Sequence, residues 1–123
     1  MKDCIFCEIV HKDPKNQVIK RYNKNELLYV CDVAVFEPLN PASKGHLLFV
    51  PDIHVDNIGD RKFYNPEVVA SVYKAVQLHL AENPTQCHVI ANNGAIAEQT
   101  VFHLHVHIIP RYEGDNLKLI WSK

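Results

Sequence analysis

Three histidines alternate with apolar residues over residues 102–110, at His103, His105 and His107. Side chains two residues apart lie on the same face of a β-strand, about 6.6 Å from one another, so we expect the three imidazoles to form a row. The residues between them are expected to point into the core: Leu104, Val106 and Ile108.

Two kinds of chemistry are open to such a row. Three imidazoles are able to hold a catalytic metal ion, as in His₃ zinc enzymes. Alternatively, a neutral imidazole attacks phosphorus, because an ordinary histidine pKa of about 6.5 leaves the ring mostly deprotonated at neutral pH. Partly protonated neighbours would then stabilise phosphate oxygens and donate a proton to the leaving group.

The polar segments around the row favour a phosphate ligand. Residues 92–94 (Asn-Asn-Gly) and 99–100 (Gln-Thr) precede the histidines, and residues 44–46 (Lys-Gly-His) lead into an apolar strand further upstream. Loops of this composition offer backbone and side-chain N–H donors to phosphate oxygens.

Together these motifs strongly resemble the histidine triad (HIT) family of nucleotide hydrolases and transferases. The family signature, His-x-His-x-His-x-x with apolar residues at x, is matched by residues 103–109, and the resemblance covers nearly the whole chain. It includes Cys-Ile-Phe-Cys at 4–7, Gly-His at 45–46, Val-Pro at 50–51 and Pro-Arg-Tyr at 110–112. The similarity is greatest to small, bacterial-type Hint-like members.

The resemblance implies an activity and a role for each site residue. The middle histidine, here His105, would attack the α-phosphorus of a purine nucleotide or nucleotide conjugate and form a nucleotidyl-histidine that water cleaves. His107 would contact the α-phosphate and assist the leaving group, and His46 would complete the histidine cluster. Three further residues would bind nucleotide or phosphate: Asn92, Gln99 and Thr100. The expected enzyme is a nucleotide phosphoramidase or dinucleoside polyphosphate hydrolase.

Two positions depart from the family pattern. Many relatives have glycine where this chain has Glu98, which adds a side chain and a negative charge beside the expected phosphate site. In many relatives an acidic residue at the position of Pro38 binds the ribose hydroxyls. Proline has no carboxylate and cannot make this contact. Both departures motivate a second hypothesis, a non-catalytic nucleotide-binding or interaction module on the same fold. A His₃ metalloenzyme is the third.

Cys4 and Cys7 have the spacing of half a structural zinc site. The resemblance implies that His54 and His103 supply the other two ligands. A closed Cys₂His₂ site would hold one structural zinc ion per chain and would fix the position of His103, the neighbour of the expected nucleophile His105. The reaction itself would then need no cofactor. A reduced cysteine pair packed near the N-terminus is the alternative.

The composition is that of an ordinary globular protein. Hydrophobic residues make up 47% of the 123 residues and charged residues 22%, which excludes disordered, collagen-like and coiled-coil chains. The 13 basic and 14 acidic residues leave a net charge of -1, so we expect neither nucleic acid nor a membrane as partner. The first residues lack a signal-peptide pattern, and a cytoplasmic protein is expected.

The apolar periodicity predicts an α+β fold in one domain, residues 1–123. A short helix or turn is expected over residues 4–10, and a long helix over residues 66–81 with Asn65 as its cap and an apolar stripe facing the core. Because the strands follow one another through short loops, we expect a HIT-like antiparallel sheet of about five strands. The strand segments lie at 18–22, 27–31, 33–36, 46–50, 88–91 and 101–109. The resemblance further implies a homodimer that uses the long helix and a neighbouring strand.

Overall fold

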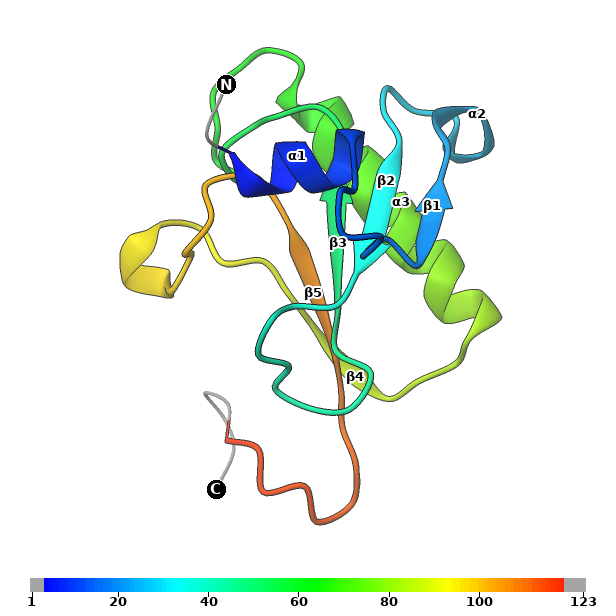
Figure 1. Ribbon diagram of the computed structural model, residues 1–123, viewed down its shortest axis with the longest axis vertical. Coiled ribbons are helices and arrows are strands. Elements are labelled where there is room, and N and C mark those ends of the chain that lie inside the picture. The colour runs from blue at the N-terminus through cyan, green and yellow to red at the C-terminus, as the bar shows by residue number, and fades with distance from the viewer. Residues whose placement is uncertain (1–3, 119–123) are drawn as a thin grey trace.

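The computed structural model describes residues 4–118, which form a five-stranded antiparallel sheet with helices on both faces (Figure 1). The predicted α+β class is therefore confirmed. In chain order the elements are α1 (Ile5–His11), β1 (Lys20–Tyr22), α2 (Lys24–Leu27), β2 (Val33–Phe36), β3 (Leu47–Pro51), α3 (Asn65–Glu82), β4 (Cys87–Ile90), the 3₁₀ turn η1 (Ala95–Ala97) and β5 (Val106–Pro110).

The strand that carries His107 is held from both sides. The strand order is β1-β2-β3-β5-β4, so β5 lies between β3 and β4. In the register of the sheet, His107 faces Leu48 on β3 and Ile90 on β4. Pairing on both edges therefore fixes the position of this histidine's backbone.

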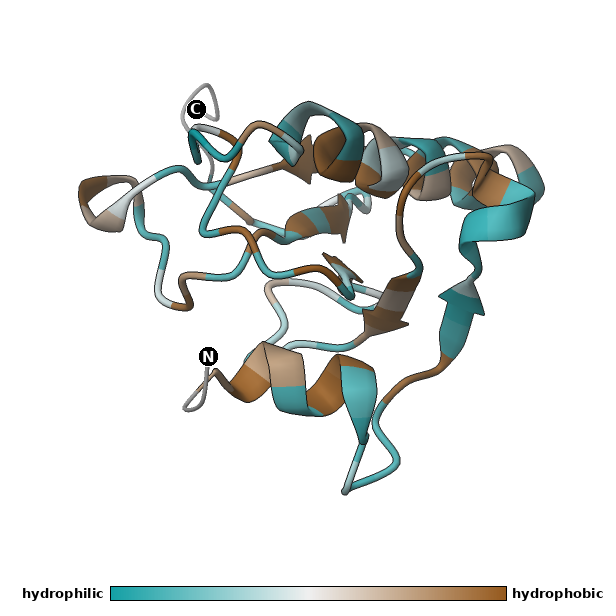
Figure 2. Cartoon of the chain, turned by 90° about the horizontal axis from the view of Figure 1, so that it is seen from above, coloured by the Kyte–Doolittle hydropathy of each residue, from teal (hydrophilic) through white to brown (hydrophobic). Residues whose placement is uncertain are grey.

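Each face of the sheet is covered by one main helix, α3 on one side and α1 on the other (Figure 2). Strand β2 shows how the sequence builds both layers. Val33 and Val35 belong to the core under α3, whereas Ala34 and Phe36 belong to the core under α1. Because both faces are buried, this strand has no polar position, and its sequence is a continuous apolar run.

Helix α3 packs on the sheet through the predicted apolar stripe. Val72 and Val76 are buried in the core, and Val69 and Leu80 pack against it from the flanks. The stripe is thus confirmed as core.

The predicted cap of α3 is wrong by one residue. Tyr64 is the N-cap, and it makes no side-chain capping hydrogen bond. Asn65 lies inside the first turn, where its buried Nδ2 faces three loop carbonyls of residues 57, 58 and 60. Asn65 therefore closes the preceding loop onto the helix.

The strand predicted over residues 27–31 is also wrong. This region begins with α2, which is stabilised by a reciprocal capping box between Asn23 and Glu26 and ends at Leu28 in the left-handed conformation. Cys31 is buried against α3 without belonging to a strand. The apolar character of the segment reflects burial in the core.

The last strand begins later than predicted, at Val106 instead of residue 101. The backbone N–H of Leu104 donates to the carbonyl oxygen of Val55 at 2.8 Å, so the chain before β5 follows the loop after β3. Within residues 4–118, no helix is both long and apolar enough to cross a membrane.

Candidate active site and metal centre

The row of histidines lies on the side of the sheet that α1 covers. The Phe6 ring of α1 packs edge-on against His103 and His105, with ring centroids 6.1 and 5.0 Å away. The rings of His105 and His107 follow at 5.1 Å. The intervening residues are buried under α3, as expected: Leu104, Val106 and Ile108. The alternation predicted for a strand thus persists in the extended chain before β5.

His105 has one ring nitrogen engaged and the other free. Its Nδ1 lies 2.8 Å from the carbonyl oxygen of His103, which only accepts, so Nδ1 carries the hydrogen of the neutral ring. Nε2 therefore holds the lone pair, and it makes no hydrogen bond to any described residue. Burial lowers the pKa of His105, against the opposing effect of the His103 carbonyl. A neutral imidazole with a free Nε2 is the form that acts as a nucleophile.

His46 and His107 form a second pair that is tied to the backbone. The N–H of Ala42 donates to His46 Nδ1 at 2.9 Å, so His46 carries its hydrogen on Nε2. That Nε2–H donates to His107 Nδ1, also at 2.9 Å. His107 then carries its hydrogen on Nε2, which is buried without a partner among residues 4–118. An unpaired buried N–H costs about 1–3 kcal/mol, and a ligand oxygen would satisfy it.

Burial keeps both rings of this pair neutral. Desolvation, followed by the neighbouring His105 and His46, lowers the pKa of His107 to about 4. Desolvation also lowers the pKa of His46. At neutral pH the pair therefore offers a hydrogen-bond donor and no positive charge, which differs from the partly protonated neighbours expected from histidine in general.

The polar loop before the row is organised by Gln99, which is buried. Its Oε1 accepts from Asn57 Nδ2 at 3.1 Å and from the Gly94 N–H at 2.9 Å. Its Nε2 donates to the carbonyl oxygens of Asp56 at 2.7 Å and Val101 at 3.0 Å. These four hydrogen bonds join two loops. Phosphate binding by Gln99 stays a prediction.

The other predicted nucleotide contacts lie on the surface of the same loop. Thr100 is exposed, and its hydroxyl makes no hydrogen bond within the described residues. Asn92 is half-buried and donates from Nδ2 to the Glu98 carbonyl oxygen at 3.4 Å. Glu98 is exposed and has a φ of 72°, in the left-handed region that glycine adopts at lower cost. The nucleotide roles of Thr100 and Asn92 stay predictions.

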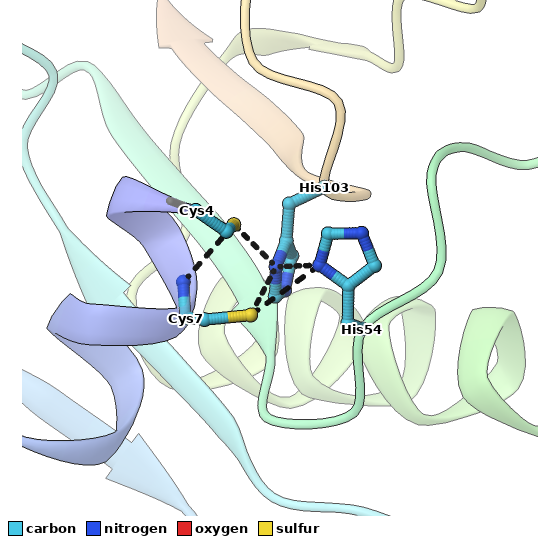
Figure 3. Close-up of side chains that lie close together, drawn as sticks. All are labelled: Cys4, Cys7, His54 and His103. Atoms are coloured by element: carbon cyan, nitrogen blue, oxygen red, sulfur yellow. Dashed lines mark hydrogen bonds between the residues drawn. The ribbon is translucent and has the colours of Figure 1, made fainter. Parts of the chain in front are cut away.

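The four predicted zinc ligands converge at the start of α1 (Figure 3). Their ligand atoms all lie within 4.8 Å of one another: Cys4, Cys7, His54 and His103. His103 Nδ1 is 3.4 Å from the Cys4 sulfur and 3.5 Å from the Cys7 sulfur, and His54 Nδ1 is 3.3 Å from the Cys7 sulfur. Ligand atoms of a tetrahedral zinc ion lie roughly 3.3–3.8 Å apart, given bonds of about 2.0–2.3 Å. The residues therefore fit a zinc ion.

Both histidines of this group have their other nitrogen facing an oxygen. His103 Nε2 lies 2.8 Å from the Pro51 carbonyl oxygen, and His54 Nε2 lies 3.2 Å from Asp56 Oδ1. These contacts place the ring hydrogens on Nε2 and aim both Nδ1 lone pairs at the cysteines, as is usual around bound metals. Burial, then the Cys4 thiol, raises the pKa of Cys7 to about 11, so a Cys7 thiolate at neutral pH requires a nearby cation.

In the described structure, the ring nitrogens of the three histidines in the row do not point toward a common position. His103 Nδ1 faces the cysteines, His105 Nδ1 faces a carbonyl oxygen, and His107 Nδ1 faces His46. The geometry therefore disfavours the hypothesis of a His₃ metalloenzyme.

A family model described as the HIT domain matches residues 20–114. The chain belongs to the HIT family. A HIT-like protein of Methanocaldococcus jannaschii is 36% identical over 115 residues, covering 91% of this chain and 81% of that protein. The protein hit of Bacillus subtilis is 31% identical over 127 residues, covering 98% and 80%.

A third relative is considerably longer. Adenylylsulfatase HINT3 of Arabidopsis thaliana is 34% identical over 120 residues, which cover 94% of this chain and 55% of that protein. The chain therefore spans about half the length of this HIT relative.

Solved structures confirm the HIT fold. A histidine triad protein from Clostridium difficile superposes with a TM-score of 0.72 at 28% identity, covering 92% of this chain and 94% of that one. A HIT family hydrolase from Clostridium thermocellum gives 0.70 at 26% identity, covering 93% and 95%. A zinc-bound histidine triad family protein from Mycobacterium smegmatis gives 0.67 at 28% identity, covering 94% and 80%.

Sequence reasoning missed the groups that orient the histidines of this HIT site. Phe6 packs on two of the rings, and the backbone groups of Ala42 and Pro51 determine which ring nitrogens carry hydrogen. No side-chain pattern signals a backbone contact. Asp56 was open to prediction, because a carboxylate two residues from a metal-binding histidine commonly orients it.

Proposed function

We propose that this HIT protein is a nucleotide hydrolase that transfers a nucleotidyl group to His105 and then to water. The substrates are nucleotide phosphoramidates or dinucleoside polyphosphates, attacked at the α-phosphorus. One observation carries the proposal: the free Nε2 of His105 stands beside His107, whose buried Nε2–H has no partner among the described residues.

The proposed chemistry has two displacements at phosphorus. First, the Nε2 lone pair of His105 forms a bond to the α-phosphorus, and the leaving group departs with the electrons of its own bond and a proton from water. In the second step the oxygen of a water molecule bonds to the phosphorus and displaces Nε2, whose electron pair returns to the ring, and the proton that this water loses neutralises the hydroxide left by the first step. The His103 carbonyl, which accepts from His105 Nδ1–H at 2.8 Å, stabilises the positive charge on the substituted ring.

His107 supplies a directed hydrogen bond to this reaction. Its Nε2–H is a neutral donor at a place where phosphoryl oxygens or the leaving group gain negative charge. His46 fixes the tautomer that makes this donor available. The residues proposed to contact the nucleotide are Asn92, Gln99 and Thr100. The main contribution of Gln99 is to hold together the two loops that it joins.

The comparisons support a nucleotide substrate. A neighbour is described as a HIT family hydrolase, and the Arabidopsis relative carries the name adenylylsulfatase. A purine nucleotide conjugate is therefore the proposed substrate class, and a cytoplasmic location remains an expectation.

We further propose one structural zinc ion per chain, held by Cys4, Cys7, His54 and His103. The zinc-bound neighbour supports this metal. Zinc would join α1 to the segment before β5, while the nucleophile stays a side chain of the protein.

A homodimer is proposed for the assembly. In the described sheet β4 is an edge strand, and Val89 on it is 40% exposed. An unpaired antiparallel edge formed by the strand that follows α3 in the chain suits the arrangement implied by the family. Light scattering that gives the mass of a single 14.1 kDa chain would contradict the dimer.

The alternative is a HIT domain retained for nucleotide binding without turnover, favoured by the exposed carboxylate of Glu98 in the polar loop. The deciding experiment measures AMP release from adenosine 5′-phosphoramidate by the wild type and by His105→Asn. We expect the wild type to turn over and the variant to lose at least three orders of magnitude. Equal rates would refute the nucleophile, and nucleotide binding without turnover would favour the alternative.

A further inference from the structure

A chain of hydrogen bonds runs from the backbone N–H of Ala42 through His46 to His107. The Ala42 amide can only donate, so it determines the direction of the whole chain. Each ring nitrogen that faces the preceding donor must accept, and the opposite nitrogen must carry the hydrogen. The last group in the chain is the unpartnered Nε2–H of His107.

The two histidines alone leave this direction open. In the reverse arrangement, His107 Nδ1–H would donate to His46 Nε2, and His107 Nε2 would present a lone pair to the site. A lone pair facing a phosphoryl oxygen is repulsive, whereas an N–H in the same place stabilises it. The direction of the chain therefore decides whether His107 supports or opposes phosphoryl transfer.

The amide that sets this direction lies in a loop with two anchors. The Tyr112 hydroxyl donates to the Lys44 carbonyl oxygen at 2.6 Å, and the Ser43 hydroxyl donates to the Pro110 carbonyl oxygen at 2.7 Å. Directly after Lys44, Gly45 has a φ of +87°, and a side chain there would come within 3.3 Å of the Pro110 ring. The loop is thus held against the end of β5, the strand that carries His107.

We propose that Ala42, Ser43 and Tyr112 are positioning residues for the transfer reaction. Ser43 and Tyr112 hold the loop so that the Ala42 amide keeps His46 and His107 in the tautomers that present an Nε2–H to the substrate. This inference rests on the proposed function, because it gives His107 the role of hydrogen-bond donor. It adds residues that never touch the substrate themselves.

The variants are chosen to remove single groups. Tyr112→Phe removes only the anchoring hydroxyl, and Ala42→Pro removes the N–H, while Ala42→Gly keeps it. Tyr29→Phe is a matched control, because Tyr29 is exposed to a similar degree, 46% against 49% for Tyr112, and contacts Lys74 of α3. If Ala42→Pro fails to fold, Tyr112→Phe alone carries the test.

Two readouts separate positioning from general stability. Nitrogen-15 NMR of labelled histidines reports which ring nitrogen carries hydrogen, and we expect Nε2 for both His46 and His107 in the wild type. In Tyr112→Phe and Ala42→Pro the His46 signals should shift toward a mixture of tautomers. We expect kcat on adenosine 5′-phosphoramidate to fall about fivefold with little change in KM, while Ala42→Gly and Tyr29→Phe match the wild type.

A mutant cycle tests whether Tyr112 acts through His46. In a His46→Ala background, Tyr112→Phe should have no further effect on kcat, because the chain is already broken. A full fivefold effect in that background, or unchanged histidine tautomers in both loop variants, would overturn the inference. A wild type without turnover would refute the proposed function instead, and the tautomer measurement would still decide whether the loop directs the chain.

Discussion

The Nδ1 atoms of His54 and His103 lie only 3.1 Å apart, although each ring has its Nε2 facing an oxygen atom. Two lone pairs at that distance repel each other unless a cation lies between them. The same His103 offers its carbonyl oxygen to His105 Nδ1. One residue thus belongs to the candidate metal centre through its ring and to the candidate active site through its backbone.

The first prediction concerns this metal centre. Elemental analysis of protein purified without added metal should find about one zinc ion per chain, and Cys7→Ser should lose it, since three ligands remain. Cys87→Ser is the matched control, because Cys87 packs against the core under α3 and belongs to no ligand group in the described structure. Zinc-free wild type, or equal zinc in both variants, would contradict the site.

Chelation of the metal should lower the thermal midpoint before it lowers turnover. The zinc would hold α1 against the segment before β5, whereas the proposed nucleophile is His105. Immediate loss of turnover in a protein that is still folded, as followed by circular dichroism, would indicate a catalytic metal instead.

The sequence predicted which histidines lie side by side in the candidate site, but it did not predict the groups that orient them. The period of two in the row placed His103, His105 and His107 on one side even where no strand forms, because any extended chain alternates its side chains. The ligand set followed from a family resemblance and was brought together by the fold. The tautomers depend on carbonyl and amide groups of Ala42 and Pro51, whose positions are properties of the tertiary structure.

The second prediction concerns Gln99, which joins the loop after β3 to the loop before the histidine row. Gln99→Leu should lower the free energy of unfolding by about 2–4 kcal/mol, because buried donors and acceptors of both loops lose their partners. Thr100→Ala is the control, since the exposed Thr100 hydroxyl bonds no described residue, and its effect should stay within about 0.5 kcal/mol. Chemical denaturation measures both, and equal stability of the two variants would contradict this role of Gln99.

The third prediction concerns Glu98. Its φ of 72° lies in the left-handed region, where any residue with a Cβ has a steric cost. Glu98→Gly should raise the free energy of unfolding by up to about 1 kcal/mol, because glycine adopts this conformation without the steric cost. Glu98→Gln keeps the strain and removes only the charge, so it should leave stability nearly unchanged. If the carboxylate also weakens nucleotide binding, both variants should lower KM equally. A lower KM in Glu98→Gly alone would assign the effect to the backbone.

The last prediction concerns pH. Burial lowers the pKa of His107 to about 4, whereas an unfolded histidine has a pKa of about 6.5. Below pH 6.5 the unfolded chain therefore takes up a proton that the folded chain refuses, and the free energy of unfolding falls until the pH reaches about 4. Above pH 6.5 this contribution is constant.

A variant isolates the contribution of this one ring. Between pH 7 and pH 5, urea titrations should show the wild type losing about 1 kcal/mol more stability than His107→Gln, after allowance for partial solvent screening. Groups that do not contact His107 contribute equally in both proteins, so their contributions cancel in the difference. Parallel curves for the two proteins would mean that His107 is protonated as easily in the folded chain as in the unfolded one. The neutral donor assigned to this ring would then be wrong.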